Sequence, residues 1–447
     1  MMEPFPDLIS CDQGQLAGHL DDIKKSLPGI MCKGIPADFS GCFGDIGDQG
    51  YFLGDQRLPM PVAFLRDDVM LKNRQWMSEF IAKAGVSLAP HGKTTLSPEL
   101  FSMQLEDGIW GITAATAQQV VFLARLGIRR ILLANQLVGE GNIHMVLDIL
   151  QQYPALQLWL TVDSRQNVDQ LVNASSAYTT PSSLRLLVEI GVEGGRTGVR
   201  CIADALDLGH HIMQQPYVQL SGIEGYEGIV AGHDQAAREQ AVQRMIATMI
   251  ECAEKFEAEK LWACDEILLT AGGTEFFDLC SPLKQFQSQI PCRAVIRSGC
   301  YISSDSIAYK RAFQRIEQRT STARQLSVPA PEGALEVWAV FQSNPESGLG
   351  FVTLGKRDIS HDWELPVPLY WFRPGEMLHP QRMPEGHTVT KLNDQHTYLH
   401  LPEDTPLQIG DLIGFGISHA CTTFDKWHCL LRVDDQYRVT GAVRTFF

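Results

Sequence analysis

The chain has 447 residues, of which 45% are apolar and 20% are charged, a composition typical of a globular protein with more than one domain. Its 37 basic and 52 acidic side chains give a net charge of −15, which argues against a nucleic-acid or anionic-membrane surface. The 11 cysteines have no regular spacing, and neither a signal-peptide pattern nor a long apolar run is visible. Together these features predict a cytoplasmic protein without a membrane span.

From residue 86 onward, short apolar runs alternate with longer amphipathic stretches. Segment 116–127 has apolar residues at helical spacing and ends in Gly127, a favourable C-cap, and segment 235–256 is a longer predicted helix. Near-continuous apolar strands between helices are typical of a parallel sheet. Eight such units predict an α/β fold of the (β/α)8 type, and an open doubly wound sheet is the alternative. The eight predicted strands are residues 86–89, 110–113, 131–134, 158–162, 184–190, 220–225, 266–271 and 293–297.

The alternation of apolar runs and amphipathic stretches ends at about residue 325. Residues 325–334 are proline-rich and read as a linker, and the runs beyond them are short and separated by turn residues, an all-β pattern. We therefore expect three parts. These are an N-terminal arm (1–56) that joins the β-domain or a partner subunit, a barrel (57–325) and a C-terminal β-domain (326–447).

Polar side chains and glycines follow several of the predicted strands, and in a parallel barrel these strand ends carry the catalytic groups. His91 and Lys93 follow the first strand in "PHGKTT". Arg196 follows the fifth strand, and Tyr226 follows the sixth. The seventh and eighth strands lead into "AGGT" and "SGCYISSD", which contain Gly273, Thr274, Gly299 and Cys300.

The two glycine-bearing loops suit a phosphate group, because their backbone N–H groups can face an anion. Barrels often bind phosphate after the seventh and eighth strands. A lysine, a phosphate site, a tyrosine and an arginine at one barrel mouth predict pyridoxal phosphate, whose aldehyde forms a Schiff base with a lysine amine. Taken singly, Lys93 and Arg196 also fit solvated loop residues, and Tyr226 fits a core tyrosine.

The segment "GISHACTTFDKWHC" (416–429) contains His419 and Cys421, two residues apart. On a β-strand this spacing places both side chains on one face, and an imidazole with a thiolate suits zinc. Two protein ligands would leave coordination positions open for water or substrate. The alternative is a structural histidine beside a buried free cysteine, and His428 and Cys429 are alternative ligands.

Together these motifs resemble the D-serine dehydratase and D-threonine aldolase family, fold-type III pyridoxal-phosphate enzymes related to alanine racemase. "PHGKTT", "GRTG", "GYEG", "AGGT", "SGCYISSD" and "SHAC" stand in the family's order, and the resemblance covers roughly residues 57 to 447. It implies an alanine racemase-like barrel, a C-terminal β-domain and a homodimer with the active site near the subunit interface.

By this resemblance, Lys93, in the same motif as His91, would bind the cofactor aldehyde. Tyr226 would approach the pyridine nitrogen, and Arg196 would lie near the ring. The phosphate would be held by Gly273, Thr274, Gly299 and Cys300, and zinc or another divalent metal by His419 and Cys421. The chain departs from the family pattern of lysine-threonine-histidine-lysine with Lys93, Thr94, Thr95 and Leu96, which bears on the substrate more than on the cofactor.

The metal pair also selects a reaction by resemblance, because zinc-dependent D-serine dehydratases carry His-x-Cys and D-threonine aldolases carry His-x-Asp. Cys421 therefore favours dehydration and deamination of β-hydroxy D-amino acids, with D-serine giving pyruvate and ammonia and D-threonine giving 2-oxobutanoate. The alternatives are a metal-dependent D-threonine aldolase, an amino-acid racemase and a pyridoxal-phosphate-binding protein without turnover.

Overall fold

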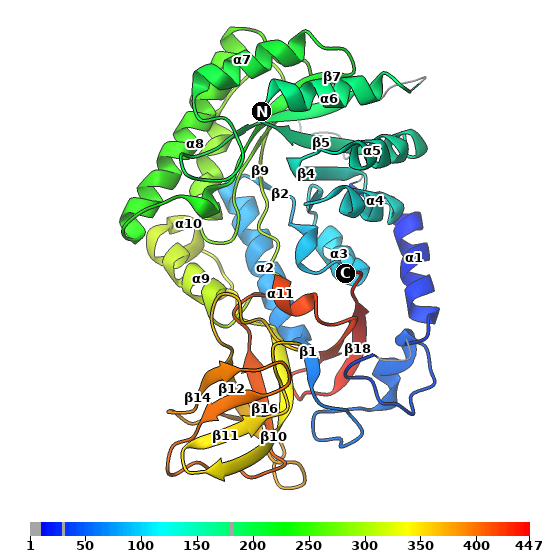
Figure 1. Cartoon of the computed structure of the whole chain (residues 1–447), viewed down its shortest axis with the longest axis vertical. Coiled ribbons are helices and arrows are strands. Elements are labelled where there is room, and N and C mark those ends of the chain that lie inside the picture. Colours follow the sequence, from blue (N-terminus) through cyan, green and yellow to red (C-terminus); the bar gives the residue numbers. More distant parts are fainter. Residues whose placement is uncertain (1–9, 29–31, 179–182) are drawn as a thin grey trace.

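The structure, a computed structural model, describes residues 10–28, 32–178 and 183–447. Most of the amino-terminal segment on which the signal-peptide expectation rests lies outside these residues. Two sheets organise the described chain, one of eight strands and one of ten. The eight-stranded sheet and its helices form the upper part of Figure 1, and the ten-stranded sheet lies below them.

The eight-stranded sheet is parallel throughout, with the strand order β2-β9-β8-β7-β6-β5-β4-β3. Each of the eight predicted strands is present, so the predicted strand count is confirmed. The strands are β2 (Ser87–Leu88), β3 (Ile112–Ala114), β4 (Arg130–Gln136), β5 (Gln157–Val162), β6 (Leu184–Ile190), β7 (Val218–Gly225), β8 (Ile267–Thr270) and β9 (Cys292–Ile296).

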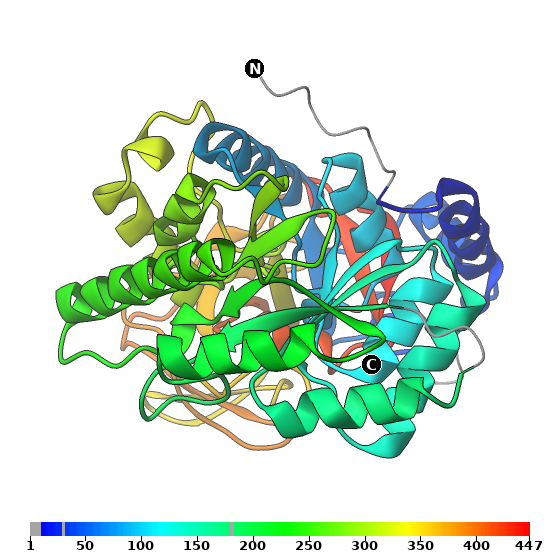
Figure 2. The same ribbon diagram turned by 90° about the horizontal axis from the view of Figure 1, so that it is seen from above.

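Helices follow the strands and cover the outer face of the sheet, as the view from above shows (Figure 2). The predicted helix at 116–127 is α4, with Thr116 as its N-cap, and the one at 235–256 is α8. The helices of this part are α2 (Asp67–Ala84), α3 (Pro98–Glu106), α4 (Ala117–Arg125), α5 (Glu140–Gln152), α6 (Arg165–Ser175), α7 (Ile202–Met213), α8 (Gln235–Ala258), α9 (Ala308–Arg319) and α10 (Ser321–Arg324).

The sheet curls into a barrel because its two outer strands, β2 and β3, are joined by backbone hydrogen bonds beyond the strands themselves. Trp110 N–H donates to the Leu88 carbonyl (2.8 Å), and Thr113 N–H donates to the Pro90 carbonyl (3.0 Å). His91 and Thr113 form a parallel bridge. The (β/α)8 barrel is therefore confirmed, and the open doubly wound sheet is excluded.

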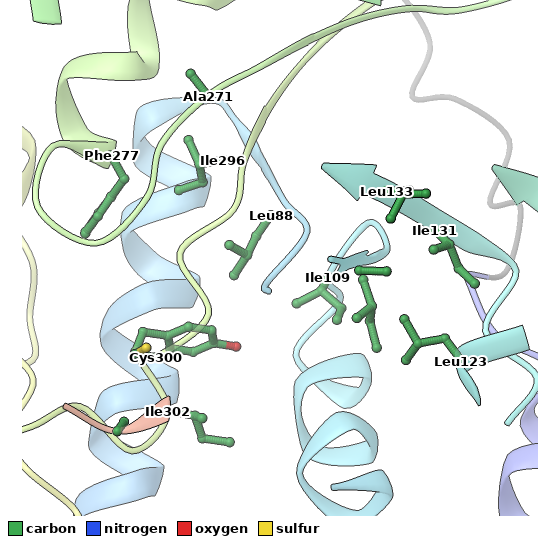
Figure 3. Close-up of a cluster of buried hydrophobic side chains, with 14 of the residues drawn as sticks. Leu88, Ile109, Leu123, Ile131, Leu133, Ala271, Phe277, Ile296, Cys300 and Ile302 are labelled. Carbon is green, nitrogen blue, oxygen red and sulfur yellow. The ribbon is translucent and has the colours of Figure 1, made fainter. Parts of the chain in front are cut away.

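Apolar side chains fill both faces of the barrel wall, which is why its strands read as continuous apolar runs. One cluster occupies the interior: Ala89, Trp110, Leu132, Trp159, Leu187, Leu268 and Val295. Residues next to these along the strands point outward and pack under the helices, for example Ile131 and Leu133 of β4 against the cluster that contains Leu123 of α4 (Figure 3). The rigid wall holds the strand ends in place.

The ten-stranded sheet forms the C-terminal β-domain and confirms the all-β prediction for the tail. Its main path runs β13-β12-β16-β10-β1-β17-β18, and β11, β15 and β14 extend from β10. Its C-terminal strands are β10 (Leu335–Glu346), β11 (Leu349–Val352), β12 (Val367–Phe372), β13 (Gln381–Arg382), β14 (Thr388–Leu392), β15 (Thr397–His400), β16 (Leu412–Gly416), β17 (Cys429–Val433) and β18 (Val439–Arg444).

The amino-terminal region contributes to both parts of the molecule. Strand β1 (Val62–Arg66) lies within the range expected for the barrel, but it pairs with β10 and β17 of the β-domain. Helix η1 (Phe43–Gln49) packs into the same domain through Phe43 and Ile46. Helix α1 (Gln13–Lys25) instead lies beside the barrel, where Asp12 pairs with Arg129 at 2.8 Å. Within the described residues, none of the helices is long and apolar enough to span a membrane.

Candidate active site

A cavity of about 510 Å³ lies where the carboxyl ends of the barrel strands face the β-domain. Small-molecule sites in proteins typically have volumes of about 300 to 1,000 Å³. Every residue predicted for the site lines this cavity: His91, Lys93, Arg196, Tyr226, Gly273, Thr274, Gly299, Cys300, His419 and Cys421. The fold thus brings together residues from the strand ends and from the C-terminal tail, while their individual roles stay predictions.

Lys93 lies in η2 (Gly92–Thr94), a single 3-10 turn that follows β2. The turn is closed by the Thr95 and Leu96 N–H groups, which donate to the Gly92 carbonyl at 3.3 and 3.0 Å. The Lys93 side chain is exposed at the cavity, and among the described residues no carboxylate pairs with it. Its amine is therefore available to a carbonyl compound.

The His91 imidazole, next to this turn, is half-buried and electrically neutral. Burial, followed by the charges of Lys93 and Arg297, holds the pKa of His91 well below its usual value. Its Nδ1 atom is buried and has no protein hydrogen-bond partner. Gly299 is required beside it, because a Cβ at that position would lie 2.6 Å from the His91 carbonyl oxygen. The cavity wall here offers a neutral ring with an unused nitrogen.

A buried ion pair that the sequence prediction missed lies at the end of β7. The Arg297 guanidinium is 2.5 Å from Glu224 Oε1, and it also donates to Thr270 Oγ1 (3.0 Å) and to the Gly225 carbonyl (2.9 Å). Burial raises the pKa of Glu224 to about 7, against the opposing effect of Arg297. Both side chains line the cavity, so one wall carries a carboxyl group that titrates near neutral pH.

Tyr226 forms the next part of the wall. The Arg196 guanidinium lies 4.5 Å from the centre of its ring, a cation–π contact. Burial raises the pKa of Tyr226, so its hydroxyl is protonated at neutral pH. Gly273 packs against the same ring, and a Cβ there would lie 2.7 Å from it. The Gly273 N–H donates to Glu227 Oε1 (2.6 Å), which takes that N–H out of the predicted set of phosphate donors.

Hydroxyl groups gather at the two loops predicted to hold a phosphate. Tyr309 of α9 donates from its hydroxyl to Thr274 Oγ1 at 2.8 Å. Ser298 is buried, and its Oγ has no protein hydrogen-bond partner. All three residues line the cavity. A buried hydroxyl without a partner is rare unless a ligand or water satisfies it. This donor set therefore fits a phosphate ester, with Tyr309 and Ser298 added to the predicted residues.

Two thiols meet on the side of the cavity that faces the β-domain. The Cys300 and Cys421 Sγ atoms are 3.6 Å apart, and both lie near Thr94 Oγ1, at 3.5 and 3.4 Å. The hydrogen bond from Cys300 lowers the pKa of Cys421 well below its usual value, with His419 and Thr94 acting in the same direction and burial opposing them. The same bond raises the pKa of Cys300. These opposite shifts favour the thiolate at Cys421 over Cys300.

His419 lies beside this thiolate and is held by a different segment of the chain. Its Nδ1 is 2.6 Å from Asp362 Oδ2, and the Trp363 ring stacks on the imidazole with centroids 3.8 Å apart and planes 7° apart. Burial lowers the pKa of His419, but Cys421 and Asp362 outweigh it, so the pKa lies above its usual value.

The expected strand geometry for the metal pair is wrong. His419 lies in a loop after β16, and Cys421 begins the one-turn helix α11 (Cys421–Phe424). The loop still brings the two side chains to the same cavity, which both of them line. The alternative ligands His428 and Cys429 are not among the residues that line the cavity.

Across residues 10–28, 32–178 and 183–447, no group of three or more histidine, cysteine, aspartate or glutamate side chains is arranged around a common ion position. The metal role of His419 and Cys421 therefore stays a prediction. An imidazole and a thiolate are donors that zinc accepts readily.

The sequence prediction overlooked several cavity residues, and their local signals differ. Ser298 and Arg297 stand immediately before Gly299 at the end of β9, so the strand-end rule could have included them. Tyr309 lies on helix α9, and Trp363 lies in the loop between β11 and β12. Neither residue follows a barrel strand, so no motif indicated them. The remaining overlooked cavity residues are Thr94, Ala115, Ala134, Asn135, Glu189, Thr197 and Glu224.

Comparison with known proteins first defines the fold class. The structure is similar to D-threonine aldolase from Filomicrobium marinum (21% identity, 89% of this chain and 97% of that chain, TM-score 0.71). It is also similar to D-threo-3-hydroxyaspartate dehydratase from Delftia sp. HT23 (19%, 87% and 98%, 0.66). A third similar structure is alanine racemase from Bacillus anthracis (12%, 86% and 97%, 0.57). The fold is therefore that of alanine racemase, a barrel followed by a β-domain.

Family comparisons then identify the two parts of the chain. Residues 68–276 match the alanine racemase N-terminal domain, and residues 334–433 match the putative serine dehydratase domain. A search of curated proteins found no match. The chain thus joins a racemase-type barrel to a serine dehydratase-type domain, which confirms the resemblance to fold-type III pyridoxal-phosphate enzymes.

Proposed function

We propose that this protein is a pyridoxal-phosphate-dependent enzyme that dehydrates and deaminates β-hydroxy D-amino acids with the help of zinc or another divalent metal. D-serine would give pyruvate and ammonia, and D-threonine would give 2-oxobutanoate and ammonia. The observation that carries the proposal is that Lys93 and the His419–Cys421 pair line one cavity. An amine and a candidate metal pair would therefore face the same bound molecule.

The cavity fits pyridoxal phosphate. Lys93 would hold the cofactor aldehyde, and Tyr226 and Arg196 would lie along the ring. The phosphate would be held by Thr274, Tyr309, Ser298, Gly299 and Cys300. The Ser298 Oγ atom, which has no protein hydrogen-bond partner, supports this assignment. When bound, pyridoxal phosphate supplies an electron sink for a carbanion at the substrate α-carbon.

His419 and Cys421 fit a divalent metal by the chemistry of their donor atoms. The lowered pKa of Cys421 favours the thiolate, which is the form that binds metal. A structure of D-threo-3-hydroxyaspartate dehydratase with a cysteine-to-alanine mutation is described as the metal-free form, and this supports a cysteine ligand in this fold. When bound, zinc supplies Lewis-acid stabilisation for a departing hydroxyl group.

In the reaction that we propose, the Lys93 amine takes the proton from the substrate α-carbon. The neutral His91 ring near Lys93 adds no positive charge to this wall, and burial keeps the Tyr226 hydroxyl protonated. Loss of the β-hydroxyl as water gives an aminoacrylate, and hydrolysis of that product gives the 2-oxo acid and ammonia. The chain's share of the catalysis is therefore a base at Lys93 and a positioned pair at His419 and Cys421.

Retro-aldol cleavage is the second candidate, favoured by the similarity to D-threonine aldolase. The same pair would act on the same β-hydroxyl, but the base would take the hydroxyl proton, and glycine and an aldehyde would be released. The Cys421 thiolate, in place of the aspartate that the resemblance gives to aldolases, favours dehydration. We also propose that the enzyme is a cytoplasmic homodimer; the 11 free cysteines support a reducing compartment.

The test is a product assay on the purified protein with pyridoxal phosphate. D-serine and D-threonine are supplied with and without a metal chelator, and ammonia, 2-oxo acid, glycine and aldehyde are measured. Ammonia with 2-oxo acid, lost on chelation and restored by zinc, is the expected result. Glycine with acetaldehyde from D-threonine would transfer the proposal to the aldolase. Conversion of the D-amino acid to its L-enantiomer without other products would indicate a racemase. Absence of any turnover would indicate a pyridoxal-phosphate-binding protein.

A further inference from the structure

The imidazole of His419 is held on several sides by one short segment, residues 360–363, between β11 and β12. The Ser360 hydroxyl accepts from the His419 backbone N–H at 3.1 Å. The Trp363 ring covers one face of the imidazole, with centroids 3.8 Å apart. The Asp362 carboxylate lies 2.6 Å from Nδ1. This segment was not singled out by any motif, and it lies almost 60 residues before His419 in the chain.

Asp362 is itself fixed in place. Its second oxygen, Oδ1, accepts a hydrogen bond from the Thr422 hydroxyl at 2.7 Å, so both carboxylate oxygens are engaged. Thr422 follows Cys421 directly, which ties the carboxylate to the loop that carries the predicted metal pair. The carboxylate is thus oriented by a hydrogen-bond partner at each oxygen, while its side chain is 39% exposed.

These contacts engage Nδ1 of the imidazole and leave Nε2 without a bond to the 360–363 segment. Nδ1 faces Asp362, where a carboxylate accepts an N–H, so Nδ1 carries the proton. The stacked Trp363 ring, parallel within 7°, opposes rotation of the imidazole. Nε2 is therefore the atom left to face the Cys421 thiolate and the cavity, which both His419 and Trp363 line.

We infer that Asp362 is a positioning residue that holds His419 in the Nδ1–H form and presents Nε2 as the metal-binding atom. The inference rests on the metal role given to His419 and Cys421 in the proposed function. Asp362 acts through His419, because its two oxygens are occupied by the imidazole and by Thr422.

The physical reason is the basicity and orientation of the imidazole. A carboxylate that accepts the second N–H of a metal-binding histidine fixes the ring and strengthens its donor nitrogen. Removal of such a partner typically weakens metal binding by about 10- to 100-fold. The stacked Trp363 adds orientation without charge, so Asp362 supplies the electrostatic part of the effect.

The experiment measures zinc affinity of the full chain loaded with pyridoxal phosphate, by competition with a chromophoric chelator. Asp362→Asn keeps the size of the side chain and removes its charge. Asp425→Asn is the matched control, because Asp425 lies at the end of α11 and pairs with Lys426 at 3.4 Å. His419→Ala defines the background. Cofactor absorbance and thermal unfolding are recorded for each variant.

We expect Asp362→Asn to bind zinc about 10- to 100-fold more weakly than wild type, with cofactor absorbance unchanged and with Asp425→Asn equal to wild type. Zinc affinity of Asp362→Asn within about twofold of wild type would overturn the inference while leaving the metal site intact. If wild type and His419→Ala bound zinc equally, the metal role in the proposed function would fail, and the inference with it.

A second measurement needs no variant and covers the case in which Asp362→Asn does not fold. Wild-type protein labelled with 15N-histidine is loaded with 113Cd, and the metal–nitrogen coupling of His419 is assigned to one ring nitrogen. Coupling to Nε2 supports the inference. Coupling to Nδ1 would contradict it, because Asp362 would then have been displaced.

Discussion

The two halves of the cavity are built in different ways. On the barrel half, groups from several parallel strands are buried and bonded to one another, as in the Arg297–Glu224 pair at 2.5 Å. On the β-domain half, a loop and a one-turn helix carry an imidazole and a thiolate beside Trp363, which is 51% exposed. In the proposed function, the barrel half would hold the anionic cofactor and the β-domain half would hold the metal. A substitution in one half should therefore abolish the binding of its own ligand and leave the binding of the other ligand unchanged.

The largest effect is expected for Lys93→Ala. Without the amine, the cofactor Schiff base and the base for the α-proton are both lost, so visible cofactor absorbance should disappear and turnover should fall by about 1,000-fold or more. Zinc affinity should stay at the wild-type value. Lys83→Ala is the control, since Lys83 lies on α2 and donates to the Gln325 carbonyl. Retention of the visible band would refute the role of Lys93.

Cys421→Ala tests the other half. Loss of the thiolate should remove zinc and lower ammonia release from D-serine by about 100-fold or more, because a bound metal contributes several kcal/mol of charge stabilisation. Visible cofactor absorbance should persist, since the cofactor is held by the barrel. Cys201→Ala, at an exposed cysteine, is the control. Turnover equal to wild type would show that Cys421 is an ordinary free cysteine.

A smaller effect is expected for Tyr309→Phe, which removes the hydroxyl bonded to Thr274 at 2.8 Å. One hydrogen bond contributes about 1 kcal/mol, so the affinity for pyridoxal phosphate should fall by about 5- to 10-fold. This affinity is measured by titrating cofactor-free protein with pyridoxal phosphate. The zinc affinity of the variant should equal that of wild type. Tyr178→Phe, which loses a surface hydrogen bond to Asp148, should leave the cofactor affinity as it is.

Glu224→Gln should change the pH dependence of stability in cofactor-free protein. Because burial raises the pKa of Glu224 from 4.5 in the unfolded chain to about 7, the folded state binds the proton more tightly. The contribution of protonated Glu224 to the free energy of unfolding is complete below pH 4.5 and is lost as the pH rises through 7. Between about pH 5 and pH 8, the free energy of unfolding should fall by about 2 kcal/mol more in wild type than in the variant. The free energy of unfolding is measured by denaturant titration at each pH. If it had the same pH dependence in wild type and in Glu224→Gln, the raised pKa of Glu224 would be contradicted.

Local sequence patterns predict the barrel and the ten site residues that the fold gathers at one cavity. Parallel strands buried on both faces read as apolar runs, so β2 to β9 were all visible, and the strand-end rule collected His91, Lys93 and the residues after them. Spacing, donor chemistry and family resemblance predict the metal pair, but the expected strand is wrong, because a loop and a one-turn helix leave no periodic signal in the sequence.

Contacts between segments far apart in the chain follow from the packing of whole elements. Strand β1 pairs with β10 and β17, far along the chain, which no local pattern in residues 62–66 indicates. Arg297 meets Glu224 only because β7, β8 and β9 lie side by side. Asp362 and Trp363 meet His419 only because the loop between β11 and β12 folds against the loop after β16. Periodicity and motifs report neighbours within an element, whereas these contacts depend on how whole elements pack.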